Sequence, residues 1–412
     1  MTYKNWKIFK LGDLCEFSSE KIETKYISNK NYISTENMLP NKQGVTIASS
    51  LPKTKKVNKF EKDDVLISNI RPYFKKIWFA NMNGGASNDV LILKNKNKEI
   101  LDNQYLFYFL STDHFFNYVT SSAKGTKMPR GDKTAIMKYE ILLPPIEDQK
   151  KIAAILSTID KKIKINNKIN KTIANIANTI FKYWFIDFEF PNENGEPYKS
   201  SGGEMIESEL GKIPKKWDIL KLGYLGEFKN GINYSRNEDG DKEYSIINVR
   251  DLVEGDFIIK NQLDKIRINS NKAESYKLLK GDLLIVRSAN PGEMGIVLED
   301  LENTIYSGFI IRFRLTEDSL LYYTYFALKS KKNKFAQYSD GTTLKNINQK
   351  MLKKINVIIP EKKVLEKFNQ IVQPIFNKIT LTNKENEYLK ELRDLLLPKL
   401  MSGEIRVPIE SE

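Results

Sequence analysis

Two stretches of this chain, 211 residues apart, have nearly the same sequence. WKIFKLGDLCEF at 6–17 and WDILKLGYLGEF at 217–228 agree at eight of twelve positions. The correspondence continues, because DVLISNIRP at 64–72 matches DLLIVRSANP at 282–291. A repeat of this length constrains the fold more than any other feature of the sequence. It predicts two homologous half-chains, each a mixture of strands and helices.

The residues that catalysis and metal binding most often need are scarce. Among 412 residues, Cys15 is the only cysteine and His114 the only histidine. One thiol excludes internal disulfides and multi-thiolate metal sites, and one imidazole excludes the histidine clusters of catalytic zinc. We therefore predict no catalytic residue and no metal site in this chain.

Charge and hydropathy indicate a partner and a compartment. The net charge of +14 and a pI near 9.3 favour a polyanionic partner, most commonly nucleic acid. Since 56 of the basic residues are Lys and 10 are Arg, codon bias in an AT-rich genome is an alternative source of the charge. The N-terminal MTYKNWKIFK lacks the apolar run of a signal peptide, and no membrane-length apolar run follows, so a cytoplasmic location is expected.

Each half-chain ends in a long apolar heptad pattern. A helix from about Ile146 to Tyr183 would span roughly 57 Å, which suits a spacer or a coiled coil. Both patterns become polar at equivalent central positions, Asn166 and Asn170 in the first and Thr382 and Asn386 in the second. If the helices pair antiparallel about a pseudo-two-fold axis, Asn166 lies near Asn386 and Asn170 near Thr382, and this polar layer would fix the register. The alternative is two separate amphipathic helices with these side chains in water.

Four segments of the sequence together are specific to one known family. They are PPIEDQKKIAAIL (144–156), IFKYWFIDFEF (180–190), GEMIESELGKIPKKW (203–217) and LRDLLLPKLMSGEIRV (392–407). Through these segments the chain resembles the DNA-specificity (S) subunit of type I restriction-modification systems. The resemblance covers essentially the whole chain. The resemblance implies an α+β fold: two homologous mixed α/β target-recognition domains joined by two long helices that pair as an antiparallel coiled coil with pseudo-two-fold symmetry.

The resemblance also implies a function and partners. Each domain would read one half of a bipartite site in double-stranded DNA, and because the two domains differ outside their framework, the site would be asymmetric. The helices would set the spacer and dock two methyltransferase (M) subunits, which carry S-adenosylmethionine, and two endonuclease/translocase (R) subunits would complete the complex. No cofactor is expected on this chain itself, since S-adenosylmethionine, ATP and Mg belong to the partner subunits.

Segment boundaries follow from the repeat and the heptads. The apolar YWFIDFEF at 183–190 is expected to be exposed, and it and LRDLLLPKL at 392–400 are expected either to close the helix pair or to dock the methyltransferase. The expected segments are a first recognition domain at 1–144, a central helix at 145–185, a linker at 186–212, a second recognition domain at 213–360, a C-terminal helix at 361–400 and a tail at 401–412.

Candidate DNA-binding residues are polar or basic side chains in two places of each domain. One place follows the strand DVLIS (64–68) or DLLIV (282–286), and the other surrounds the turn GTKM (125–128) or GTTL (341–344). Such side chains can donate to base edges or to phosphates. The alternative for each is an ordinary solvated surface residue. The candidates are Asn69, Arg71, Tyr73, Lys75, Lys76, Lys124, Lys127 and Arg130 in the first domain, and Arg287, Ser288, Asn290, Thr342, Thr343 and Lys345 in the second.

Catalytic motifs fail when the two copies are compared. GTKMPRGDKT at 125–134 lacks the spacing of a phosphate-binding loop, and its twin has no second Gly. EFK at 227–229 could be half of a nuclease site, but its twin is EFS. The preferred hypothesis is a non-catalytic DNA-reading and scaffolding subunit. A stand-alone DNA nuclease with an unrecognised active site and an adaptor that binds only protein are the alternatives.

Overall fold

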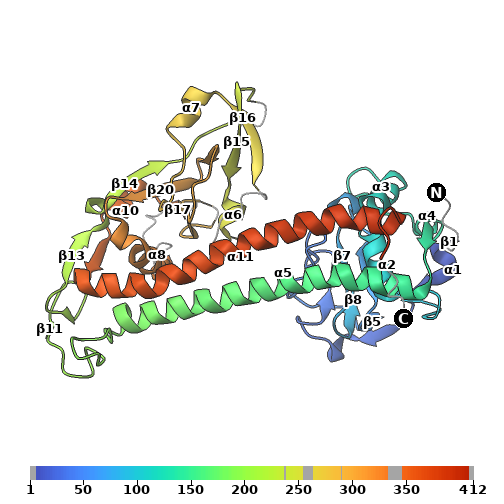
Figure 1. The fold of residues 1–412 in the computed structure, drawn as a ribbon, viewed down its shortest axis with the longest axis horizontal. Helices are drawn as coiled ribbons and strands as arrows, with labels where there is room; N and C mark the ends of the chain where they lie inside the picture. Colours follow the sequence, from blue (N-terminus) through green and yellow to red (C-terminus); the bar gives the residue numbers. More distant parts are fainter. Residues whose placement is uncertain (1–5, 236–237, 254–262, 289, 333–345, 408–412) are drawn as a thin grey trace. The chain divides into compact units, whose positions relative to one another are not determined.

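The computed structural model describes residues 6–235, 238–253, 263–288, 290–332 and 346–407. The chain forms two compact units: unit 1 is Met1–Ile163 with Tyr388–Glu412, and unit 2 is Lys164–Glu387. Each unit contains one repeated half-chain and a part of both long helices, α5 (Ile146–Phe181) and α11 (Lys362–Ser402) (Figure 1). The units thus divide both helices, whereas the sequence boundaries treat each helix as a segment of its own.

Unit 1 is built on two four-stranded sheets and one two-stranded sheet. The sheets have the orders β2-β9-β6-β7, β3-β5-β8-β4 and β1-β10. All neighbours are antiparallel except β4 and β8. Besides the long helices, the elements are β1 (Lys7–Lys10), α1 (Leu11–Leu14), β2 (Cys15–Phe17), β3 (Lys21–Glu23), η1 (Thr24–Tyr26), β4 (Tyr32–Ile33), β5 (Lys56–Phe60), β6 (Val65–Ser68), η2 (Pro72–Phe74), β7 (Ile77–Phe79), β8 (Gly84–Ala86), β9 (Val90–Asn95), α2 (Asn103–Leu110), α3 (Asp113–Ser121), α4 (Lys133–Met137) and β10 (Glu140–Leu143).

Unit 2 repeats this framework. Its sheets β14-β20-β17-β18 and β13-β21 correspond to β2-β9-β6-β7 and β1-β10. A three-stranded sheet has the order β16-β15-β19, and β11 pairs with β12 in a further two-stranded sheet. The elements are η3 (Lys182–Ile186), β11 (Met205–Ile206), β12 (Ile213–Pro214), β13 (Asp218–Lys221), η4 (Leu222–Tyr224), β14 (Gly226–Asn230), β15 (Lys242–Ile247), α6 (Val249–Val253), β16 (Asp264–Ile268), α7 (Ser270–Glu274), β17 (Leu283–Val286), β18 (Met294–Ile296), β19 (Thr304–Tyr306), β20 (Ile310–Leu315), η6 (Asp318–Leu320), α8 (Leu321–Ser330), α10 (Gln349–Lys353) and β21 (Asn356–Ile359).

The core of unit 1 joins its first sheet to both long helices. Apolar residues of β6 and β9 pack with α2, with Ile152 and Leu156 of α5, and with Leu400 and Met401 of α11. Gln149 at the start of α5 is fully buried, and its amide bonds the backbone of Asp102, Ile100 and Pro144 at 2.9 Å each. A buried polar group needs hydrogen-bond partners, and this amide finds all of its partners in the chain before α2 and before α5. Its three bonds therefore hold the start of α5 against the start of α2.

The core of unit 2 contains much of the aromatic segment at the end of α5. The sequence predicts that YWFIDFEF is exposed, and this is wrong for most of its aromatic residues. Trp184, Phe185 and Phe190 are buried in the core with Trp217 and Phe368, whereas Tyr183 and Ile186 are exposed. The physical reason is aromatic packing: Phe185, in the π-helical turn at Lys182–Ile186, packs edge-on against Phe368 with ring centroids 4.9 Å apart, and Phe190 stacks on Trp217 at 5.0 Å.

The polar heptad positions meet in unit 2. The Asn166 amide donates to Asn386 Oδ1 at 2.9 Å, and both side chains are buried. Asn170 donates to Asn383 at 2.8 Å and not to Thr382, whose hydroxyl bonds the Lys378 carbonyl of its own helix. A Thr inside a helix readily makes this bond to the preceding turn. Since residue numbers rise along α5 as they fall along α11, the helices are antiparallel here.

Replacing this amide pair tests its role. Asn166→Leu should destabilise unit 2 by about 1 to 3 kcal/mol, because Asn386 keeps a buried polar group that has lost its donor. The double substitution Asn166→Leu with Asn386→Leu should recover that loss, since an apolar pair suits the seam of a coiled coil. Hydrogen exchange in β17, which reports the stability of unit 2, measures the difference among the three proteins. A double variant as unstable as the single one contradicts this account.

Candidate nucleic-acid interface

Three chain segments of unit 1 converge at the end of β6. Asn69, the residue after this strand, donates its backbone N–H to Asp89 O at 2.8 Å and accepts from Gly131 N at 3.0 Å. We call these three residues the loop junction of unit 1. The segment before Gly131 is the Gly125 turn, which is closed by paired backbone bonds between Lys124 and Arg130 at 2.9 Å. The junction thus joins both groups of candidate residues in this domain.

Two of the unit 1 candidates hold buried polar atoms with no partner. Asn69 is buried, and its side-chain oxygen has no hydrogen bond among the described residues. Arg71 has a left-handed backbone with φ of 49° and donates its N–H to Pro129 O at 2.7 Å, and its buried Nε has no partner in the described part of the chain. Strained backbone and unsatisfied buried polar atoms are unusual in a folded domain and concentrate at functional sites.

Most basic candidates of unit 1 are already bonded to acceptors of the chain. Lys124 pairs with Asp132 at 2.6 Å, Arg130 with Asp89 at 3.1 Å, and Lys75 with Asp113 at 2.9 Å. These contacts lower the pKa of two carboxyl groups: the Lys124 hydrogen bond is the main cause at Asp132, and the Lys75 hydrogen bond is the main cause at Asp113.

The other unit 1 candidates differ in exposure and contacts. Lys76 donates to Thr35 O at 2.6 Å, and burial lowers the pKa of its amine. Lys127 and Tyr73 are exposed, and the Tyr73 ring lies 4.7 Å from that of Phe74. A phosphate would therefore compete with a carboxylate or a carbonyl at most of the basic positions, whereas Lys127 is open to solvent.

Unit 2 has the same junction at equivalent positions. Arg287, the residue after β17, donates its N–H to Phe309 O at 2.9 Å and accepts from Ile347 N at 2.9 Å. These three residues form the loop junction of unit 2. Its backbone bonds repeat those of unit 1, but its side chains are Arg, Phe and Ile where unit 1 has Asn, Asp and Gly. The two units therefore share the backbone geometry of the junction but differ in the charge and polarity of the side chains at its three positions.

The remaining unit 2 candidates follow Arg287 or lie outside the described residues. Ser288 O accepts from Asn290 N at 2.9 Å in the turn that leads to β18. Thr342, Thr343 and Lys345 fall in the part of the chain that the structure does not describe.

Sequence reasoning missed Asp89, Phe74 and Phe309. Asp89 and Phe309 occupy the same position of the aligned repeat, and this difference between the copies was a signal that could have found them.

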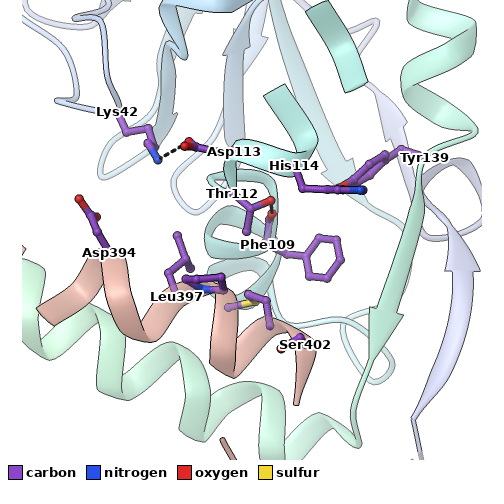
Figure 2. A pocket seen from close by; sticks show the side chains of 11 residues that line it. Lys42, Phe109, Thr112, Asp113, His114, Tyr139, Asp394, Leu397 and Ser402 are labelled. Carbon is purple, nitrogen blue, oxygen red and sulfur yellow. Dashed lines mark hydrogen bonds and ion pairs between the residues drawn. The ribbon is translucent and has the colours of Figure 1, made fainter. Parts of the chain in front are cut away.

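A cavity of about 380 Å³ in unit 1 lies between α3 and the end of α11 (Figure 2). Two pairs of its polar side chains bond each other: Asp113 pairs with Lys42 at 3.3 Å, and His114 Nδ1 lies 2.6 Å from the Tyr139 hydroxyl. Its floor is apolar, with Phe109, Leu397 and Met401. The Lys75 pair connects Asp113 to the candidate loop, so the α3 end of the cavity anchors that loop.

Other kinds of site are not found in the described part of the chain. No group of three or more His, Cys, Asp or Glu that could hold a metal ion occurs among the described residues. Among the helices that the structure describes, none is both long and apolar enough to cross a membrane.

The fold and the two junctions define a protein that presents two different sets of loop side chains on copies of one framework. The sequence model of the family described as Type I restriction modification DNA specificity domain matches residues 3–175 and 214–391. The chain belongs to this family.

Known relatives agree with that assignment. The type I restriction enzyme MjaIX specificity subunit of Methanocaldococcus jannaschii is 30% identical over 320 residues, which cover 75% of this chain and 71% of the relative. The HindI specificity subunit of Haemophilus influenzae is 26% identical and covers 97% of this chain and 100% of the relative. A crystal structure of a type I S subunit from M. genitalium has the same fold, with a TM-score of 0.54 at 16% identity over 99% of this chain and 97% of that one.

Proposed function

We propose that this chain is the DNA sequence-recognition subunit of a type I restriction-modification complex and is itself non-catalytic. Each unit reads one half of an asymmetric bipartite site through its loop junction and the adjoining loops. The two helices set the spacer between the half-sites and dock two methyltransferase subunits. S-adenosylmethionine, ATP and Mg are bound by the methyltransferase and endonuclease partners.

The repeated loop junction carries this proposal. A protein that needs two different specificities on one scaffold keeps the backbone that positions the reading side chains and changes the side chains themselves. Asn69 and Arg287 occupy the same position between the same two backbone bonds, but Asn69 is buried with an unsatisfied side-chain oxygen, whereas Arg287 is half-buried and is a residue type that makes bidentate contacts to guanine. Different side chains at equivalent positions predict different half-sites.

Exposed apolar residues on α5 in unit 2 support docking of a protein partner there. Ile165, Ile169 and Ile176 are exposed at 55%, 40% and 47%. Their spacing of four and seven residues places them on one face of the helix. A row of exposed isoleucines is unusual on a helix whose other side already packs in a core, and it supports docking of an apolar partner surface.

Unit 1 has a second such row, on α11. Tyr388, Leu392 and Leu395 are exposed at 71%, 45% and 59%, again on one helix face. Leu392 is 216 residues after Ile176, which is the offset of the heptad repeat. We name the two rows the α5 stripe and the α11 stripe. One stripe in each unit supports two docking positions for the same partner, and hence two methyltransferase copies.

Mapping adenine methylation in cells with and without the gene tests the proposed function. We expect one split motif, with two different halves and a fixed spacer, to be methylated only when the gene is present. Complementation with Asn69→Ala should alter one half of the motif, and Arg287→Ala the other half. Methylation unchanged by deletion contradicts the proposal, and so does one variant that alters both halves.

Salt dependence separates DNA reading from a role in protein contacts alone. The complex with its methyltransferase should lose about 10³-fold in DNA affinity between 50 and 200 mM salt if it neutralises about six phosphates. Fluorescence anisotropy with the mapped site measures this. Incubating the purified chain alone with DNA and Mg²⁺ is the control, and it should give no cleavage. Cleavage by the chain alone contradicts a non-catalytic role.

A further inference from the structure

In the part of the chain that the structure describes, exposed phenylalanine occurs only near the loop junctions. The chain has 21 phenylalanines, and among those that the structure describes only Phe74 and Phe309 are exposed, at 38% and 61%. Phe74 belongs to the candidate loop after β6, and Phe309 to the loop junction of unit 2. Scattered exposed apolar residues are normal, but among the described residues this residue type is otherwise withdrawn from water and is exposed only beside the loop junction of each unit, which indicates a contact to be made there.

Phe309 is directly opposite Arg287. The antiparallel register of β17 and β20 pairs Val286 with Ile310, and the Arg287 N–H bond to Phe309 O extends this pairing by one residue. Side chains at opposite positions project from the same face, with Cβ atoms about 5 Å apart. Successive base pairs of DNA rise by about 3.4 Å, so two such side chains can reach neighbouring base pairs.

The guanidinium of Arg287 is available for a ligand. Within the described residues Arg287 makes no side-chain hydrogen bond or ion pair, and it is half-buried. In unit 1 the residue at the position of Phe309 is Asp89, whose carboxylate holds Arg130 at 3.1 Å. Unit 2 has replaced that carboxylate with an apolar ring, so it presents a cation and an exposed ring side by side.

We propose that Phe309 is a specificity-determining residue of unit 2, and that Phe309 and Arg287 together read a thymine next to a guanine. The Phe309 ring packs on the 5-methyl group of thymine in the major groove. Arg287 donates two hydrogen bonds to O6 and N7 of the guanine, the contact that suits a guanidinium best. This inference rests on the proposed DNA-reading function.

Deoxyuridine provides a direct test, because it lacks only the thymine methyl group and keeps every hydrogen-bonding atom. The complex with its methyltransferase is titrated with duplexes of the mapped site in which each thymine is replaced singly. One replacement beside a guanine, in the half-site that Arg287→Ala alters, should weaken wild-type binding about four-fold, the value of one buried methylene-sized group. The same replacement should not change the DNA affinity of a complex that contains the Phe309→Ala variant.

Phe74→Ala is the matched control, since it removes the other exposed phenylalanine and should leave the deoxyuridine effect in that half-site unchanged. Loss of affinity in Phe309→Ala that is equal for thymine and deoxyuridine at every position overturns the proposal, and so does a half-site with no thymine beside a guanine. In both cases the complex still binds its site. A wild-type complex that does not bind the mapped site overturns the proposed function instead.

Discussion

The double substitution of Ile176→Asp in the α5 stripe and Leu392→Asp in the α11 stripe is expected to abolish DNA methylation by the assembled complex. Both residues are exposed, so the charge is well solvated in the free chain, and the fold should be unaffected. In a docked complex each carboxylate would be buried in an apolar contact without a partner, which costs several kcal/mol. We expect each substitution to weaken its own contact about 100-fold or more.

Stoichiometry distinguishes the two stripes. Size-exclusion chromatography with light scattering should give two methyltransferase copies on the wild-type chain, one on each single variant and none on the double variant. Lys171→Asp is the control, because this exposed residue lies on α5 away from the stripe and should keep both copies. If the folded double variant still binds two copies, the stripes are not the docking surfaces.

The helices and their pairing could be predicted from the sequence because the signals are local and periodic. A heptad pattern can be seen without knowing what packs against it. The polar positions Asn166 and Asn386 could be aligned because the repeat gave an internal comparison. The exact partner of Asn170 could not, since choosing between Thr382 and Asn383 depends on rotamers and on the competing bond to the preceding turn.

The loop junctions could be predicted only in part. The segments that carry Asn69 and Gly131 are 62 residues apart, and pattern reasoning placed both near DNA without showing that they touch. The burial of individual aromatic residues could not be predicted from the sequence either. Both Phe185 and Phe309 stand among apolar neighbours in the sequence, yet the first is 3% exposed and the second 61%. Tertiary packing decides which of the two rings is buried. Neither a strand end nor a π-helical turn has a periodic hydrophobic pattern from which this packing could be predicted.

A buried ion pair occupies the same place in both units. Asp282 is fully buried, accepts from Leu279 N at 2.8 Å, and receives both Nε and Nη2 of Arg314 at 2.7 Å. This contact is also the main reason why the pKa of Arg314 is raised. In unit 1 the equivalent Asp64 accepts from Glu61 N at 2.7 Å and pairs with Lys94 at 2.9 Å. The pair is therefore part of the repeated framework and not of either reading surface.

Asp282→Asn should destabilise unit 2 by about 3 kcal/mol, because it removes one partner of a buried bidentate pair and leaves the guanidinium without its counter-charge. Hydrogen exchange measured separately in β17 and β6 reports each unit, since a two-unit chain has no single unfolding free energy. Only β17 should lose protection.

Asp64→Asn is the matched variant for unit 1, and its cost should be smaller, about 1 kcal/mol. Lys94 keeps a second carboxylate, Glu61, at 3.2 Å, whereas the other side-chain contact of Arg314 is a carbonyl at 3.4 Å. Asp282→Leu with Arg314→Met should restore much of the lost stability, since an apolar pair of similar volume can replace a buried ion pair. Equal losses from Asp64→Asn and Asp282→Asn would contradict this account, because the difference between them depends on the alternative partner that Lys94 has and Arg314 lacks.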